Sequence, residues 1–242
     1  MRLALWTPRP ARGWLAGVVP QLERAARLVV VADESRPRPQ VDVDLYHVAN
    51  DPAHGFVYRA LLERPGLVVL EDWRLHELVL AETAGRGDPD AYRREARRSR
   101  GATGEFIARQ VLRGLGGELP SLLALNERVL EASLALAVTR AGDLPRAAAC
   151  VAGRPFVQLP LGAGDAGPAA AALIALAREA LPRLPAALRA ARLRQAAEAT
   201  PLGRALGELR PLARELGLAE LPPGSVGRVA ALLPGPPEAG ES

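Results

Sequence analysis

Short apolar runs alternate with longer segments of helical periodicity through the first two thirds of the chain. The runs are rich in Leu and Val, and they lie at 2–6, 28–32, 44–48, 67–70, 134–138 and 156–159. Several are continuously apolar, which is typical of parallel strands covered by helices on both faces. Strands that alternate with helices indicate βαβ units. The pattern therefore predicts an α/β protein with a Rossmann-like three-layer α/β/α domain over residues 1–165.

The segment between the fourth and fifth predicted strands carries only helical patterns. The sequence DPD at 88–90 supplies an N-cap, a proline at the first helical position and an acid in the first turn. We expect this helix to end at Gly101, because glycine is common where helices stop. Two more helices are expected at about 103–114 and 121–133. Together these elements predict a helical insertion in the α/β domain.

Beyond residue 165 the strand pattern ends. Residues 166–217 hold Ala, Leu and Arg at helical spacing and predict a helical appendage, whereas residues 218–242 are rich in Pro and Gly and predict a mobile tail. Apolar positions recur at helical spacing at Leu202, Leu206, Leu209, Leu212 and Leu216. These helices either pack back on the sheet or present a surface to another chain, and the sequence leaves both alternatives open.

Composition and charge narrow the class of protein. The chain has 31 basic residues, all of them Arg, against 27 acidic residues, so its net charge is +4. This excess is too small to indicate nucleic acid as a partner, and no zinc-finger, homeodomain or RNA-binding motif accompanies it. A hydrophobic content of 49% is enough for a packed core. We therefore expect a globular protein that does not bind nucleic acid.

The single cysteine, Cys150, excludes an internal disulfide and any zinc cluster built from several cysteines. The first residues do not form a secretory signal pattern, and no apolar run reaches the roughly 18 residues that span a bilayer. We expect a cytoplasmic protein with no transmembrane segment, for which peripheral contact with a membrane surface stays open.

Two adjacent carboxylates, Glu71 and Asp72, follow the fourth predicted strand. In open parallel sheets, ligands bind at the carboxyl ends of the strands, so this position favours a functional site. Neighbouring residues on a strand point to opposite faces, and only one of the two can face a given substrate. Glu71 is the candidate for a catalytic carboxylate in the cleft. Asp72 either shares that site or caps a helix that begins near Trp73.

All three histidines, His47, His54 and His76, fall within thirty residues of the chain. Imidazole and carboxylate groups suit zinc or iron, but the spacing fits no metal motif, so we expect no metal and no cofactor. The turn NDP at 50–52, followed by His54, either caps a helix or presents polar groups to hydroxyls or a phosphate.

Four arginines share one face of the first insertion helix: Arg93, Arg94, Arg97 and Arg98. Such a face is either solvated or binds an anionic ligand, a lipid surface or an acidic patch on a partner. The sequence GAGDAG at 162–167 has the form of a dinucleotide fingerprint, but Pro168 follows it and no later strand completes the βαβ unit. We interpret it as a linker, and a small nucleotide-binding enzyme remains a third hypothesis.

The order of motifs resembles the N-terminal half of family 4 glycosyltransferases over about residues 1–162. The most specific matches are YHVANDPAHGFVY at 46–58 and GDPDAYRRE at 87–95. The resemblance implies the acceptor-side domain of a GT-B enzyme, in which two Rossmann-like domains face each other across a cleft. It also implies a set of acceptor-binding residues, namely Gly13, His47, Asn50, His54 and His76.

The sequence departs from the family pattern in four places. Residues 168–242 lack the βαβ pattern of the family's donor-binding domain. Glu71 stands where the family has the first histidine of an LHDxxLHH motif, whose side chain faces the donor sugar. Trp14 stands in a loop that the family builds from small residues, and PLG at 160–162 replaces a PHG motif. The site has therefore been altered or has lost its original activity.

These observations predict a glycosyltransferase-like protein that holds a hydroxyl acceptor for sugar transfer from a nucleotide sugar, without a metal. Glu71 and Asp72 are the candidate catalytic residues. A second glycosyltransferase chain would supply the donor domain, and the nucleotide sugar would bind only through that partner. The isolated chain is then expected to be inactive. The alternative is a non-catalytic pseudo-glycosyltransferase that acts as a binding or scaffold protein.

Overall fold

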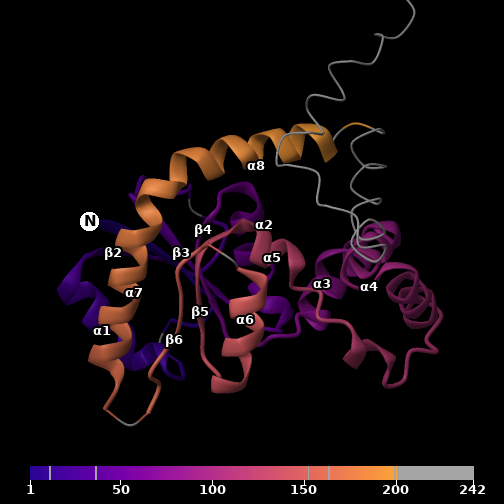
Figure 1. Ribbon diagram of the computed structural model, residues 1–242, viewed down its shortest axis with the longest axis horizontal. Helices are drawn as coiled ribbons and strands as arrows, with labels where there is room; N and C mark the ends of the chain where they lie inside the picture. Colours follow the sequence, from indigo (N-terminus) through magenta and orange to yellow (C-terminus); the bar gives the residue numbers. More distant parts are fainter. Residues whose placement is uncertain (11, 36, 152, 163, 199, 201–242) are drawn as a thin grey trace, which may run out of the picture.

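A computed structural model describes residues 1–200, except residues 11, 36, 152, 163 and 199 (Figure 1). The helical pattern at 202–216 and the Pro/Gly-rich segment at 218–242 lie outside the described residues. Every helix within the described part of the chain is too short or too polar to span a bilayer.

A six-stranded parallel sheet forms the centre of the molecule, in the order β2-β1-β3-β4-β5-β6. The strands are β1 (Arg2–Trp6), β2 (Arg27–Val31), β3 (Val43–Val48), β4 (Gly66–Leu70), β5 (Ser133–Val138) and β6 (Phe156–Gln158). Each begins and ends within one residue of its predicted position. The α/β class and the Rossmann-like arrangement of parallel strands are confirmed.

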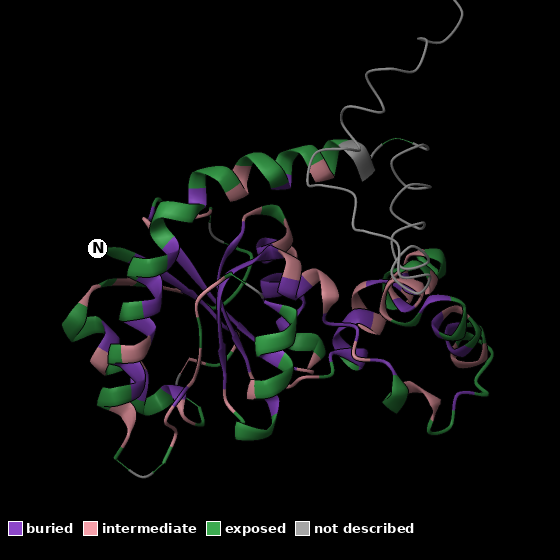
Figure 2. Ribbon diagram, viewed as in Figure 1, coloured by how far each residue is buried: buried purple, intermediate pink, exposed green. Residues whose placement is uncertain are grey.

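Helices cover both faces of this sheet, which makes three layers (Figure 1). On one face, which we call the α1 face, lie α1 (Leu15–Ala25) and α7 (Ala166–Ala180). On the other, the α2 face, lie α2 (Gly55–Glu63), α3 (His76–Glu82), α5 (Glu127–Ala132) and α6 (Leu144–Cys150). The central strands are buried on both sides (Figure 2). The apolar runs of β1, β4 and β5 follow from this double burial.

The helical insertion is dominated by α4 (Pro89–Leu112), which bends at Arg100 and Gly101, where the backbone is not helical. The predicted break at Gly101 is therefore confirmed. At the start of α4, the Asp88 carboxylate accepts a hydrogen bond from Ala91 N at 2.8 Å, as expected of an N-cap. Short 3-10 turns flank the helices at Pro52–His54, Ala84–Arg86, Leu119–Leu122, Ala141–Asp143 and Leu181–Arg183.

The third predicted insertion helix, at 121–133, is wrong in its extent. A 3-10 turn ends at Leu122, and α5 begins only at Glu127. Between them Leu125 has a φ of 52°, in the left-handed region that interrupts a helix. Ser133 already belongs to β5, so α5 is short.

The first helix of the predicted appendage, α7, packs against α1 and the sheet. Its buried residues include Leu173 and Ile174 on the α1 face. At its start, Ala166 lies so close to Gly17 of α1 that a Cβ at position 17 would be 3.2 Å from the Ala166 Cβ. The second helix, α8 (Leu184–Glu198), is mostly exposed and crosses one edge of the molecule (Figure 2). Of the two alternatives for these helices, packing on the sheet or presenting a surface to another chain, α7 therefore takes the first.

The crossover from β2 to β3, at residues 32–42, contains no helix among its described residues, which lack only residue 36. A side chain takes the place of a helix over this part of the α2 face. The Arg38 guanidinium lies over the Trp6 ring, 4.6 Å from its centroid, and it donates to Ala60 O at 2.8 Å. Arg38 therefore links β1 to α2 across the gap.

Arg38 is held in place by Asp44, a carboxylate that is fully buried within the sheet. Asp44 accepts hydrogen bonds from Trp6 Nε1 at 2.8 Å and from Arg38 Nη1 at 3.3 Å. Arg64 Nε lies 3.1 Å from the same carboxylate, close enough for an ion pair but without hydrogen-bond geometry. Removing one partner of a buried ion pair leaves the other charges uncompensated. We therefore expect substitutions in this cluster to lower the stability of the fold strongly.

We expect Asp44→Ala to lower the free energy of unfolding by about 3–5 kcal/mol, since it leaves Arg38, Arg64 and the Trp6 N–H without their buried acceptor. Asp42→Ala is the matched control, because Asp42 pairs with Arg2 at the surface and should change stability little. Urea unfolding midpoints of the three proteins test this. Equal shifts for the two variants would contradict the assignment.

Candidate functional site

The sheet reverses its order between β1 and β3, and the candidate site lies at the carboxyl ends of these strands. From β1 the chain passes through α1 to β2 on one side, whereas from β3 it passes through α2 to β4 on the other. Because α1 and α2 cover opposite faces, the loops that leave β1 and β3 diverge. Open α/β sheets bind their ligands at such a point.

A row of hydrogen bonds crosses this point from the interior to the surface. The Thr7 hydroxyl, directly after β1, lies 3.0 Å from His47 Nδ1, and His47 Nε2 lies 2.5 Å from Glu71 Oε2. Thr7 and His47 are buried, whereas 38% of the Glu71 side chain is exposed. A carboxylate beside Nε2 favours a ring proton on that nitrogen, and in that tautomer Nδ1 accepts from the Thr7 hydroxyl. Only the outer end of the row, Glu71, is open to a ligand.

The hydrogen bond from His47 lowers the pKa of the Glu71 carboxyl group, and partial burial opposes this effect only in part. The Trp14 indole N–H lies near the same carboxylate and lowers its pKa further, without reaching hydrogen-bond geometry. Glu71 is therefore ionised at neutral pH. An ionised carboxylate is a good hydrogen-bond acceptor for hydroxyl groups and a poor general acid.

His54 lies behind His47, at the end of the Pro52–His54 turn. The two rings meet nearly edge to face, with centroids 5.0 Å apart, and His54 Nε2 is 3.4 Å from His47 Nδ1. Burial lowers the pKa of His54 to about 4, and the neighbouring His47 adds to this effect. His54 is therefore neutral at pH 7. Its Nδ1 is buried and has no hydrogen-bond partner in the described protein.

Trp14 covers His47 from the side of α1. Its ring stands edge-on to the imidazole, with centroids 5.6 Å apart and an angle of 88° between the planes. The preceding Gly13 has a φ of 57°, a left-handed conformation that turns the chain just before α1. Gly13 itself is exposed, and its part in acceptor binding stays a prediction. The bulky residue noted in the sequence thus stands beside Glu71.

The Asp72 side chain joins three loops. Its Oδ2 accepts from Asn50 N at 3.0 Å, and its Oδ1 pairs with Arg140 Nη2 at 2.7 Å. The alternative in which Asp72 caps a helix near Trp73 is wrong. The helix there, α3, begins at His76, and the side chain of Asn50 caps it by accepting from Glu77 N at 2.8 Å.

His76 lies apart from the Glu71 row. Its Nε2 is 2.8 Å from the Tyr92 hydroxyl, and its Nδ1 is 3.2 Å from Glu77 Oε1. The ring is buried and joins α3 to α4, so the structure places it with the insertion. Of the predicted acceptor-binding residues, His47 contacts Glu71, and His54 contacts His47.

The four arginines of α4 are each paired with a carboxylate. Two of these pairs join residues near the start of the helix, and two reach further along the insertion: Arg93–Asp90, Arg94–Asp88, Arg97–Glu105 and Arg98–Glu131. These pairs compensate much of the positive charge that made this face a candidate for anions. Its use as an anion-binding surface stays a prediction.

Two residues of the site, Thr7 and Arg140, were not among the predicted set. Thr7 is the first residue after β1, and Arg140 is the second after β5. The rule that pointed to Glu71, proximity to the carboxyl end of a parallel strand, applies equally to both. Within the described residues, no group of three or more His, Cys, Asp or Glu side chains is arranged to hold a metal ion.

No protein-family model, no curated protein and no solved structure matches this chain. The chemistry of the site therefore follows from the side chains around Glu71. The site offers one ionised, half-open carboxylate held by a buried imidazole, with an aromatic ring at its side. Such a group can accept hydrogen bonds from a hydroxyl or take up its proton.

His54 makes the stability of the fold depend on pH. The unfolded chain takes up a proton on this residue below about pH 6.5, whereas the folded chain does so only near pH 4. Between these values the unfolded state binds more protons, so the free energy of unfolding falls as the pH falls. We expect His54→Gln to reduce this slope by up to about 1.4 kcal/mol per pH unit.

Chemical denaturation between pH 4 and 7 measures the slope, and Glu71→Gln serves as the control. Because the pKa of Glu71 is lowered from an ordinary value of 4.5, its contribution is complete above that pH and is lost only below it. Glu71→Gln should therefore keep the slope between pH 4.5 and 6.5. If His54→Gln kept it as well, His54 would not be the titrating group.

Proposed function

We propose that this chain is a glycosyltransferase-like protein that holds a hydroxyl acceptor beside Glu71, and that a partner chain supplies the donor site for sugar transfer. The observation that carries the proposal is the row Thr7–His47–Glu71 at the point where the strand order reverses. The row fixes an ionised carboxylate at the place where a Rossmann-like sheet receives its ligand. The resemblance of residues 1–162 to family 4 glycosyltransferases supports the same assignment.

Glu71 would accept the hydrogen of an acceptor hydroxyl and orient its oxygen. In transfer, that oxygen forms a bond to the anomeric carbon of the donor sugar, and the bond from this carbon to the nucleotide phosphate breaks. The hydroxyl proton passes to Glu71. His47 positions the carboxylate, and Asp72 fixes the neighbouring loops through Asn50 and Arg140. A carboxylate with a lowered pKa is a weak base, so orientation is its main contribution.

The second candidate is a pseudo-glycosyltransferase that binds a ligand or scaffolds a partner without catalysis. Trp14 favours it, because the indole packs on His47 and its N–H lies near the Glu71 carboxylate. The ring then occupies space that a substrate would need. In this case the row serves to fix the loops at the carboxyl edge.

Binding and transfer assays separate the two candidates. The purified chain is titrated calorimetrically with a panel of monosaccharides and polyols, and with UDP-glucose and GDP-mannose, alone and mixed with glycosyltransferases encoded in the same genome. We expect acceptor binding by the chain alone and transfer only in a mixture. Glu71→Gln should weaken acceptor binding at least tenfold, because it removes the charged acceptor of the hydrogen bond. Glu23→Gln, an exposed change of equal charge on α1, should leave it unchanged.

Each outcome decides between the candidates. Transfer by the isolated chain would overturn the need for a partner. Acceptor binding without transfer in any mixture would favour the non-catalytic protein. Loss of binding in Glu23→Gln to the same degree as in Glu71→Gln would show that the effect is one of overall charge. Absence of any acceptor binding would overturn the first proposal.

A further inference from the structure

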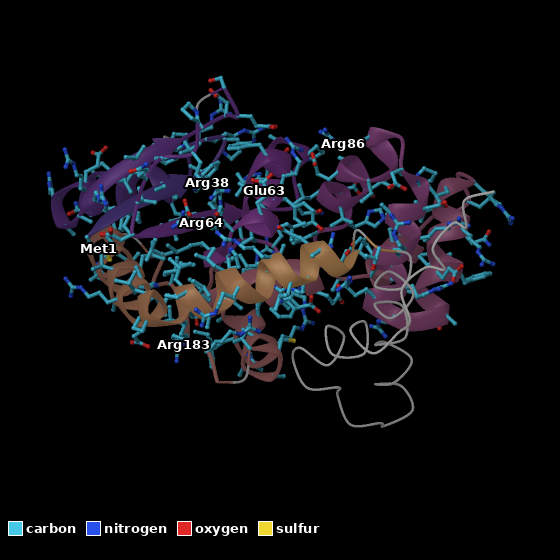
Figure 3. The ribbon with its side chains drawn as sticks, turned by 90° about the horizontal axis from the view of Figure 1, so that it is seen from above. Met1, Arg38, Glu63, Arg64, Arg86 and Arg183 are labelled. Carbon is cyan, nitrogen blue, oxygen red and sulfur yellow. The ribbon has the colours of Figure 1, made fainter. Side chains whose placement is uncertain are left out.

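A hollow of about 210 Å³ lies where α2, α5 and α8 meet. The hollow is at the amino ends of β4 and β5, the opposite edge of the sheet from Glu71, since Glu63 lies three residues before β4 and Ala132 directly precedes β5. Seen from above, Glu63 lies beside α8, which runs across this edge (Figure 3). Most of the lining side chains are charged or polar: Glu63, Arg128, Glu131, Arg194 and Gln195.

Both carboxylates of this lining are already paired with arginines on other elements. Glu63 lies 3.6 Å from Arg38 Nη2, and Glu131 lies 3.2 Å from Arg98 Nη1. Their negative charge is therefore compensated without the cations of the hollow. The lining cation on α5, Arg128, pairs with Glu95 at 3.4 Å.

Arg194 on α8 differs from these residues. It forms no ion pair with any carboxylate whose side chain is described between residues 1 and 196. A second guanidinium, that of Arg154, stands near it and is engaged by backbone carbonyls, with Nη1 donating to Ser133 O at 2.8 Å. Burial lowers the pKa of Arg154, and the charge of Arg194 contributes in the same direction. Arg194 therefore lines the hollow with a positive charge that no described carboxylate pairs, and an anion there would compensate it.

We infer that the hollow binds a small oxyanion, a phosphate or carboxylate group, with Arg194 as its main ligand and Arg128 as the second. The guanidinium fork suits such groups, because it places two N–H donors parallel to two oxygens. The volume is below the roughly 300–1,000 Å³ of sites for larger ligands, which restricts the ligand to a small molecule or a single group. This inference concerns the opposite edge of the sheet and does not depend on the proposed sugar site.

The anion would also tie α8 to the rest of the protein. The helix buries only a few of its residues, Leu184 and Ala191 among them. A hydrogen bond from Gln195 Nε2 to Leu62 O at 3.2 Å holds it to α2. An oxyanion bridging Arg194 and Arg128 would add a link between α8 and α5. Binding should therefore slow the opening of α8.

Inorganic phosphate and acetate are the probes, each titrated into the full chain by calorimetry at constant ionic strength balanced with chloride. Hydrogen exchange of residues 184–196 is followed in parallel. We expect saturable binding of at least one probe, with slower exchange in α8. Arg194→Gln should weaken it at least tenfold, and Arg194→Lys should lie between the two, since it keeps the charge and loses the fork. Arg192→Gln, exposed on the same helix, is the matched control and should bind as the unchanged chain does.

The comparison of phosphate with acetate identifies the preferred group. Equal binding by Arg194→Gln and the unchanged chain would overturn the inference. So would an equal loss in Arg192→Gln, because the effect would then be one of net charge. If Arg194→Gln did not fold, hydrogen exchange on the unchanged chain decides: no slowing of α8 exchange by either probe, relative to chloride, would overturn the inference.

Discussion

Both faces of the central strands of the sheet are buried, and this constraint decides where the polar groups of these strands can lie. A strand covered on both sides has no solvated face. Its polar side chains therefore either lie at the ends of the strand or are paired with other polar groups in the interior. At the carboxyl edge the first solution applies: Thr7 and Glu71 directly follow β1 and β4, and Arg140 is the second residue after β5. Asp44 shows the second solution, with its carboxylate fully buried and paired. The candidate site and the buried cluster are thus two results of one requirement.

The six strands were predictable because each is a short apolar run bounded by turn residues, and the position of Glu71 followed from the end of β4. The helices of the insertion were less predictable. Leu125 adopts a left-handed conformation that leucine rarely takes, and nothing in the local pattern signals it. The role of Asp72 was also hidden, because the cap of α3 comes from Asn50, which is distant in sequence. Local patterns identify strands well, but they do not identify caps that arrive from another loop.

The two edges of the sheet differ in their chemistry. At the carboxyl edge, hydrogen bonds and ion pairs join the loops after β1, β3, β4 and β5, and the most accessible group of the central row is an ionised carboxylate, Glu71. At the amino edge, the chain gathers arginines around Glu63 and Glu131, and α8 lies across them. The proposals made for these edges therefore involve ligands of different charge. A neutral hydroxyl compound suits the first, and an oxyanion suits the second.

The cluster around Asp44 also has a consequence for the order in which the chain folds. It joins residues that are far apart in sequence, from Trp6 through Arg38 to Arg64. No short fragment contains all of its partners, so it cannot form as a local nucleus. Contacts of this kind form only after the loops between the partners have closed, which costs conformational entropy. The crossover at residues 32–42, which holds Arg38, should therefore take its final position after β1, β3 and α2 have come together. During synthesis, the Asp44 carboxylate can be fully paired only after Arg64 has been added to the chain.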